Sequence, residues 1–175
     1  MSTSTTATSN NIASAFIAEL EQEAATTRKC IERVPAEKFD WKPHEKSMTF
    51  GRLAQHVAEM FAWTPNTLEH PELDFSKFDY TPAELTTTED LVKNLDKNVA
   101  EALQTLRNTS DEVFMENWTM RNGEQVYFTM PKVAVMRSFV MNHIVHHRGQ
   151  LSVYLRLNDI PVPSIYGPSA DEGQM

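Results

Sequence analysis

The segment Met141-Asn142-His143-Ile144-Val145-His146-His147-Arg148-Gly149-Gln150-Leu151 holds three of the chain's six histidines. Around it, apolar residues recur at helical spacing, at Met136, Val140, Ile144, Leu151, Tyr154 and Leu155. His143 and His147 are four residues apart, so a helix places both imidazoles on one face, one turn apart. We expect this face to point into the core, where two imidazoles at this spacing can bind one metal ion.

A histidine pair on a partly apolar helix face also has a purely structural interpretation. Buried imidazoles are often hydrogen-bonded to a hydroxyl or a carbonyl across a packing interface. Two ligands are, moreover, fewer than a zinc site needs. A third histidine on a comparable face is therefore required before the metal interpretation is favoured.

The composition indicates one soluble, largely helical domain. A chain of 175 residues can bury a sizeable core, and its 41% hydrophobic and 23% charged residues are typical of globular proteins. Only five glycines occur, and long stretches show a spacing of three to four residues. The net charge of −8 and the pI near 5.2 argue against nonspecific binding to nucleic acid and against binding to an anionic membrane surface.

The single cysteine, Cys30, excludes an internal disulfide and a multi-cysteine metal site. We interpret it as a small hydrophobic residue or a half-exposed thiol on the first helix. No apolar run approaches the roughly 20 residues of a membrane span. The N-terminal MSTSTTATSNN has neither the basic region nor the apolar region of a signal peptide, so we expect a cytoplasmic protein.

Hydrophobic periodicity predicts four long helical segments, at about residues 12–34, 47–69, 86–107 and 131–158. Four such segments favour an all-α fold, a four-helix bundle with long crossing loops. We expect a disordered, Ser/Thr-rich tail at residues 1–10, the bundle at residues 11–163 and a C-terminal tail at residues 164–175. Residues 164–168 are expected to pack back on the surface.

Local signals mark the ends of these segments. The turn Arg121-Asn122-Gly123-Glu124 lies between β-prone runs, and Asn-Gly in this context is typical of a hairpin, so we expect a short two-stranded ribbon before the last helix. Thr86 with Glu89 indicates a capping box at the start of the third helix. Pro65 is expected to kink or end the second helix.

The third histidine lies on the second helix. His56 follows Leu53 by three residues and precedes Met60 by four, so it shares the inward apolar face. Alone it is equally compatible with a hydrogen-bonded core histidine. Facing helices of a bundle can nevertheless build a metal site in the core. His56, His143 and His147 together would form a three-imidazole site with an open position, as in catalytic sites for zinc or a similar divalent metal.

Residues around the last-helix histidines have weaker signals. His146 is rotated by about 100° from His147 on a helix, which places it beside the site. Gln150 lies three residues beyond His147 and can contact its ring. Arg148 is expected to face outward or an interface, and Glu23 on the first helix to lie on a solvated face.

Other candidates belong to loops and helix ends. His44 and His70 are expected to be exposed in loops. Trp63 either closes over a pocket or packs in the core, and Glu59 reaches the edge of the site or lies on the surface. Gly149 would let another backbone or a substrate approach, or is a tolerated helix glycine. The sequence identifies no general base.

Three segments carry a family resemblance: Gly51-Arg52-Leu53-Ala54-Gln55-His56-Val57-Ala58-Glu59, the preceding Asp40-Trp41-Lys42-Pro43, and His143-Ile144-Val145-His146-His147-Arg148-Gly149-Gln150-Leu151 with Tyr154-Leu155-Arg156. Over about residues 12–163 the chain resembles the DinB/YfiT-like superfamily of metal-dependent four-helix-bundle proteins. The resemblance implies that His56, His143 and His147 bind a divalent metal ion, most often nickel or zinc. It also implies a homodimer.

Function follows less directly from the resemblance. Some relatives are transferases or isomerases that use the metal to activate a low-molecular-weight thiol, and many have no assigned reaction. Our first hypothesis is a metal-dependent thiol transferase or hydrolase that acts on a small-molecule thiol or another small substrate. The alternatives are a non-catalytic metal-binding module, in stress response or interaction, and a protein whose three histidines only pack. The family name refers to induction by DNA damage and not to DNA binding. The acidic net charge of the chain agrees with this distinction.

Overall fold

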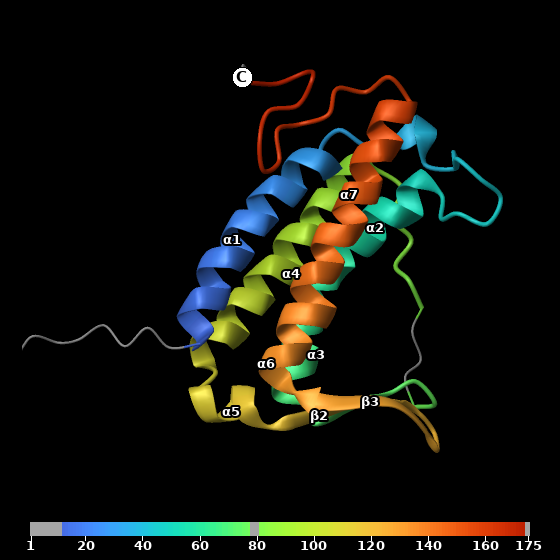
Figure 1. Cartoon of the computed structure of the whole chain (residues 1–175). Helices are drawn as coiled ribbons and strands as arrows, with labels where there is room; N and C mark the ends of the chain where they lie inside the picture. The colour runs from blue at the N-terminus through green and yellow to red at the C-terminus, as the bar shows by residue number, and fades with distance from the viewer. Residues whose placement is uncertain (1–11, 78–80, 174–175) are drawn as a thin grey trace, which may run out of the picture.

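The computed structural model describes residues 12–77 and 81–173, which form a mostly helical protein with one small sheet (Figure 1). The tail predicted at residues 1–10 lies outside this part. The helices are α1 (Ile12–Ile31), α2 (Phe50–Glu59), α3 (Trp63–Glu69), α4 (Thr88–Asn108), α5 (Asp111–Met115), α6 (Lys132–Val135) and α7 (Asn142–Leu157). The helical prediction is thus confirmed, while the count of four helices stays a prediction, because several short helical segments accompany the long ones.

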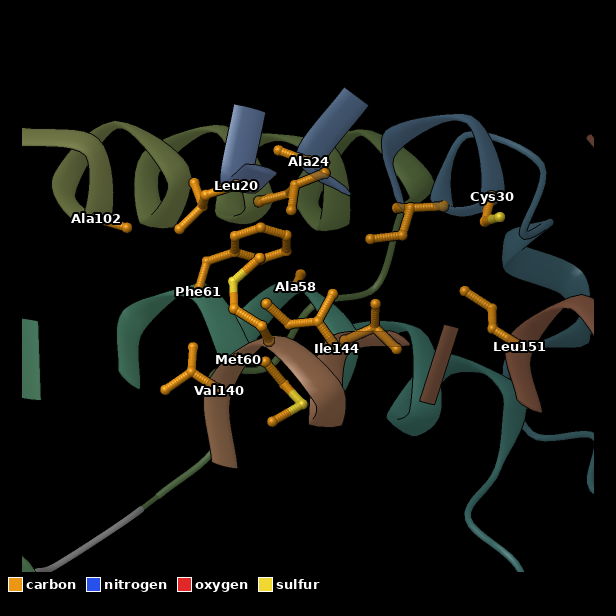
Figure 2. Packing of buried hydrophobic residues seen from close by; sticks show 14 of the residues in the cluster. Leu20, Ala24, Cys30, Ala58, Met60, Phe61, Ala102, Val140, Ile144 and Leu151 are labelled. Carbon is orange, nitrogen blue, oxygen red and sulfur yellow. The ribbon is translucent and has the colours of Figure 1, made fainter. Parts of the chain in front are cut away.

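Four of these helices surround the main core. α1 packs against α4 and α7, and α2 packs against the same two helices from the other side. Each helix turns one apolar stripe inward, because removal of this surface from water drives the packing. Figure 2 shows side chains of the cluster meeting between the helices, among them Leu20, Phe61, Val140 and Ile144. Among the described helices, none combines the length and the apolar character that a membrane crossing requires.

The predicted second helix is divided into two. α2 begins at Phe50, because the Thr49 hydroxyl accepts a hydrogen bond from the Arg52 N–H at 3.3 Å and caps the helix. A 3-10 turn (Met60–Ala62) follows, and then α3. Pro65 lies in the first turn of α3, where its missing N–H costs no helical hydrogen bond. The expected interruption is therefore confirmed, and it comes before the proline.

The cap of α4 differs from the predicted one by one residue. The hydroxyl of Thr87, not of Thr86, accepts a hydrogen bond from the Asp90 N–H at 3.1 Å. It also donates to the Asp90 carboxylate at 2.7 Å. Thr87 and Asp90 thus form one half of a capping box one residue later than predicted, and the Asp90 carboxylate contacts the Thr87 hydroxyl instead of the backbone N–H.

The sheet is larger than the predicted ribbon. β2 (Asn117–Asn122) and β3 (Gln125–Pro131) form the expected antiparallel hairpin, and Gly123 in its turn has a positive φ of 57°. β1 (Glu72–Asp74) joins β2 in parallel, so the sheet has three strands in the order β1-β2-β3. The prediction of a two-stranded ribbon was therefore wrong, because a three-residue strand is too short to show periodicity.

Asp74 attaches β1 to the hairpin. Its Oδ1 accepts hydrogen bonds from the Gly123 N–H at 2.9 Å and from the Ser76 N–H and hydroxyl at 3.0 and 2.7 Å. These bonds hold the pKa of the Asp74 carboxyl well below its usual range. The sheet lies at one end of the helices (Figure 1). Leu73 and three other buried residues form a small apolar cluster of their own: Trp118, Met120 and Val135.

The last helical run contains an unexpected π-helical segment. It extends from α6 through π-helical residues Met136–Met141 into α7. The wider π turn places one more residue in each turn than an α-helix, and such segments often accompany functional sites. Here it directly precedes His143. The periodic apolar pattern gave no sign of it.

The C-terminal tail packs back on the protein, as predicted for residues 164–168. The Tyr166 hydroxyl lies 2.6 Å from Arg148 Nη2 and 3.0 Å from both carboxylate oxygens of Glu23. Arg148 and Glu23 form an ion pair at 2.5 Å, and their side chains are only 1% and 6% exposed. The expectation that Glu23 is solvated and that Arg148 faces outward or an interface was therefore wrong, because the two charges neutralise each other inside the protein.

Candidate metal centre

The three predicted histidines lie together in the structure. His56 comes from α2, whereas His143 and His147 come from α7, which packs against α2. One ligand atom from each of the three residues can be chosen so that all lie within 4.8 Å of one another. The ring centroids of His147 are 4.6 Å from those of both His56 and His143. Two distant parts of the sequence thus supply one compact cluster.

The cluster lies at the margin of the core rather than inside it. All three histidines are half-buried, whereas their neighbours Val57 and Ile144 are fully buried. The expectation that the histidines point into the core is therefore corrected: they flank the apolar stripes that join α2 to α7. This position keeps the imidazoles accessible from one side.

Burial keeps the cluster neutral. Burial, followed by repulsion from the positive charges of His147 and Arg52, lowers the pKa of His56 to about 4. Burial, followed by repulsion from His147, lowers the pKa of His143 to about 4. The pKa of His147 is also lowered, mainly by burial. Near neutral pH, three uncharged imidazoles therefore offer lone pairs to a cation.

Hydrogen bonding selects the nitrogen that His147 can offer. Its Nδ1 lies 2.7 Å from the Oε1 atom of Gln150, which is an acceptor, so Nδ1 carries the proton and Nε2 carries the lone pair. Metal-binding imidazoles are commonly oriented by an acceptor in this way. The contact that the sequence suggested for Gln150 is confirmed.

His143 has a polar atom without a hydrogen bond. Its Nδ1 is buried and makes no hydrogen bond of ordinary geometry with the described residues, although the Phe139 backbone is close enough to the ring to raise its pKa against the effect of burial. Buried polar atoms are rarely left in this state, because their desolvation is then uncompensated. A bound metal ion would compensate it if Nδ1 is the ligand atom. The neutral donor set and this orphaned nitrogen both fit a divalent metal such as nickel or zinc.

A cavity of about 550 Å³ lies beside the cluster, with His56 in its wall. Arg52 and Glu59 of α2 line it together with His56, and Trp63 at the start of α3 also lines it. Arg52 and Glu59 form an ion pair at 3.0 Å, and Gln55 Nε2 donates to Glu59 Oε1 at 2.7 Å. Glu59 therefore lines the cavity next to His56, and Trp63 both lines the cavity and packs against the core.

Two residues of the cavity were missed in the sequence. Asn94 and Asn98 of α4 line it, and neither was a candidate in the sequence. Asn98 is 7% exposed and lies at helical spacing between the buried Leu95 and Ala102. A polar residue within an inward stripe was therefore a signal that could have revealed it.

The remaining candidates lie outside the cluster. His44 and His70 are exposed on loops, as predicted. His146 is exposed, with its ring centroid 4.8 Å from that of His147, which confirms its place beside the site. Cys30 is buried with a free thiol, and burial raises its pKa to about 11, so it behaves as a hydrophobic residue. A Cβ atom on Gly149 would meet no heavy atom within 4 Å among the described residues.

Comparison with known proteins gives concordant results. The sequence model of the DinB family matches residues 1–174. The chain is 29% identical over 162 residues to the uncharacterized protein YrdA of Bacillus subtilis (strain 168). This alignment covers 90% of this chain and 89% of YrdA. A DinB-like protein from Bacillus cereus ATCC 10987 has a similar fold, with a TM-score of 0.66, 21% identity, and coverage of 87% of this chain and 97% of that one. A DinB-like protein from Bacillus subtilis gives a TM-score of 0.67 at 18% identity, covering 85% and 95%.

Proposed function

Because the chain belongs to the DinB family, we propose that it is a metal-dependent enzyme in which His56, His143 and His147 bind one divalent ion, nickel or zinc. The observation that carries this proposal is a cluster of three neutral imidazoles, one of which, His56, lines a cavity. A purely structural cluster would need no adjoining space for a substrate. A catalytic site requires both a cation and room for the reacting molecule.

The proposed reaction is transfer of a low-molecular-weight thiol to an electrophile, or hydrolysis. The bound metal would act as a Lewis acid and lower the pKa of a thiol or a water molecule, which gives a nucleophile at neutral pH. Gln150 would hold the His147 ring so that Nε2 faces the ion. Arg52 and Glu59 would shape the cavity next to His56.

A non-catalytic metal-binding module is the second candidate, favoured by the fact that the cluster joins α2 to α7. A metal at this position would tie the two helices together and stabilise the fold. The two proposals differ in what the cavity does. Turnover that requires both metal and an open cavity supports the enzyme, whereas stabilisation without turnover supports the module.

The first test is metal content, measured by elemental mass spectrometry on protein purified without a His tag. We expect near-stoichiometric nickel or zinc in the wild type and loss of the metal in His147→Ala. His146→Ala is the matched control, because its ring is exposed and adjacent, and it should retain the metal. Wild-type protein that holds no metal after incubation with nickel or zinc would overturn the proposal. Metal-loaded protein is then assayed with low-molecular-weight thiols and electrophiles.

We also propose a homodimer, as the family resemblance implies. Light scattering coupled to size-exclusion chromatography measures the mass directly. A dimer has twice the 20.0 kDa mass of the chain. A mass of one chain at micromolar concentration would overturn this proposal.

A further inference from the structure

The cavity beside the histidines has a chemical character of its own. We infer that it binds the body of an uncharged, partly apolar molecule that carries an N–H or O–H donor, and that Asn98 selects for this donor. The inference rests on the proposed function, because it names the class of substrate for that site. It can nevertheless be tested on metal-free protein. The volume of the cavity, about 550 Å³, is within the usual range for small-molecule pockets.

One wall of the cavity is apolar and aromatic. Trp63, Leu73 and Phe75 contribute to it. The Trp63 ring is supported from behind by Phe139, at a centroid distance of 5.0 Å, and the Phe139 ring lies 5.5 Å from that of His143. The ring of a ligand against Trp63 would therefore pack on a supported surface and lie close to the histidine cluster. Such a wall favours an apolar or aromatic group.

The charges of the lining are balanced. Among the described lining residues, the full charges are those of Arg52 and Glu59, and these two residues pair with each other at 3.0 Å. A ligand whose body carries a charge would lose its hydration without gaining an opposite charge. The lining therefore disfavours a charged body.

Asn98 provides an oriented acceptor. Its Nδ2 donates to the Ala58 carbonyl at 2.9 Å and to the Asn94 Oδ1 at 3.4 Å. These bonds use both donor hydrogens of the amide and fix its orientation. Among the described residues, none donates a hydrogen bond to Oδ1, and this oxygen is not one of the fully buried unpaired atoms, so it remains accessible although the residue is only 7% exposed. A ligand N–H or O–H would satisfy this oxygen, whereas a ligand without a donor would leave it unpaired.

Three isosteric probes separate these features: benzamide, acetophenone and benzoate. Benzamide is uncharged and carries an N–H donor, acetophenone replaces the NH₂ group with CH₃, and benzoate is an anion of the same shape. Binding is followed on the whole, metal-free protein by ¹H–¹⁵N NMR. Among the indole N–H signals, that of Trp63 reports on this cavity, because Trp63 lines it.

We expect benzamide to shift the Trp63 signal and to bind about fivefold more tightly than acetophenone, which corresponds to one ordinary hydrogen bond. Benzoate should bind at least about tenfold more weakly than benzamide. In Asn98→Leu the preference for benzamide over acetophenone should disappear. Phe75→Ala should weaken all three probes and keep the preference, and it is a safe second variant because Phe75 is 40% exposed. Asn108→Leu, exposed on the same helix, is the control and should change nothing.

Three results would overturn the inference. These are benzoate binding as tightly as benzamide, a preference for benzamide that survives Asn98→Leu, and the absence of a Trp63 shift with every probe up to its solubility limit. Metal uptake is measured separately on the same preparations. Failure of the histidines to take up metal would then overturn the proposed function and leave the probe binding unaffected. Failure of the probes would leave the metal site intact.

Discussion

The Nδ1 atom of His147 lies 2.7 Å from the Oε1 atom of Gln150, one turn further along α7. This contact fixes the ring orientation and the tautomer, so it places the lone pair on Nε2. It also makes Gln150 the residue through which the affinity of His147 for metal can be tuned without removing the ligand.

Replacing Gln150 with Leu is therefore expected to weaken metal binding by about tenfold, within the range found for such orienting partners. His147→Ala should abolish stoichiometric binding. Competition with a chromophoric chelator measures both effects. Gln104→Leu is the control, because Gln104 is exposed on α4. Equal affinities of Gln150→Leu and wild type would show that the contact does not orient the ligand.

Stability of the metal-free protein should depend on pH through the cluster. Folding lowers the pKa of His56 and His143 from 6.5 to about 4, so the unfolded chain binds more protons between these values. The contribution of the cluster to the free energy of unfolding is thus full above pH 6.5 and falls as the pH drops toward 4. Thermal unfolding is monitored by circular dichroism as the pH is lowered from above 6.5 toward 4. The melting temperature of His56→Gln should then decrease less than that of the wild type. The control is His44→Gln, in an exposed loop, whose melting temperature should depend on pH as that of the wild type does.

Two helix glycines should respond oppositely to alanine. A Cβ on Gly51 would lie 2.8 Å from Cγ of Phe39, whereas one on Gly149 would meet no heavy atom within 4 Å among the described residues. Gly51→Ala is expected to lower the free energy of unfolding by about 1–3 kcal/mol through overpacking. Gly149→Ala should raise it by about 0.5–1 kcal/mol, because alanine favours the helix. Urea unfolding measures both. If Gly51→Ala and Gly149→Ala had comparable free energies of unfolding, the close approach of Phe39 to Gly51 would be contradicted.

The buried ion pair of Glu23 and Arg148 predicts strongly non-additive mutations. Removing either partner, in Glu23→Leu or Arg148→Met, leaves a buried charge and should cost about 3–5 kcal/mol of unfolding free energy. The double variant should recover most of this loss, because no buried charge remains. A double-mutant cycle by denaturant unfolding provides the test. Additive single effects would mean that the two side chains are stabilised independently.

Local spacing was sufficient to identify the metal-site candidates. His143 and His147 are four residues apart within a helical pattern, and His56 stands between two apolar residues of another helix, so each position on its own helix could be inferred. The hairpin at Gly123 could be inferred for the same reason, because a tight turn is determined by adjacent residues. The π-helical segment could not, since it alters the period on which such inference depends.

The sequence by itself determined that the protein is mostly helical, that a hairpin turns at Gly123, and that His143 and His147 share one side of a helix. The tertiary structure decided that β1 joins β2, that Asn98 reaches the cavity, and that Arg148 is buried against Glu23, 125 residues away. The physical reason is the range of the interactions. Periodicity reports which residues share a face of one element, whereas a cavity or a buried ion pair depends on which faces of distant elements meet when the apolar surface is buried.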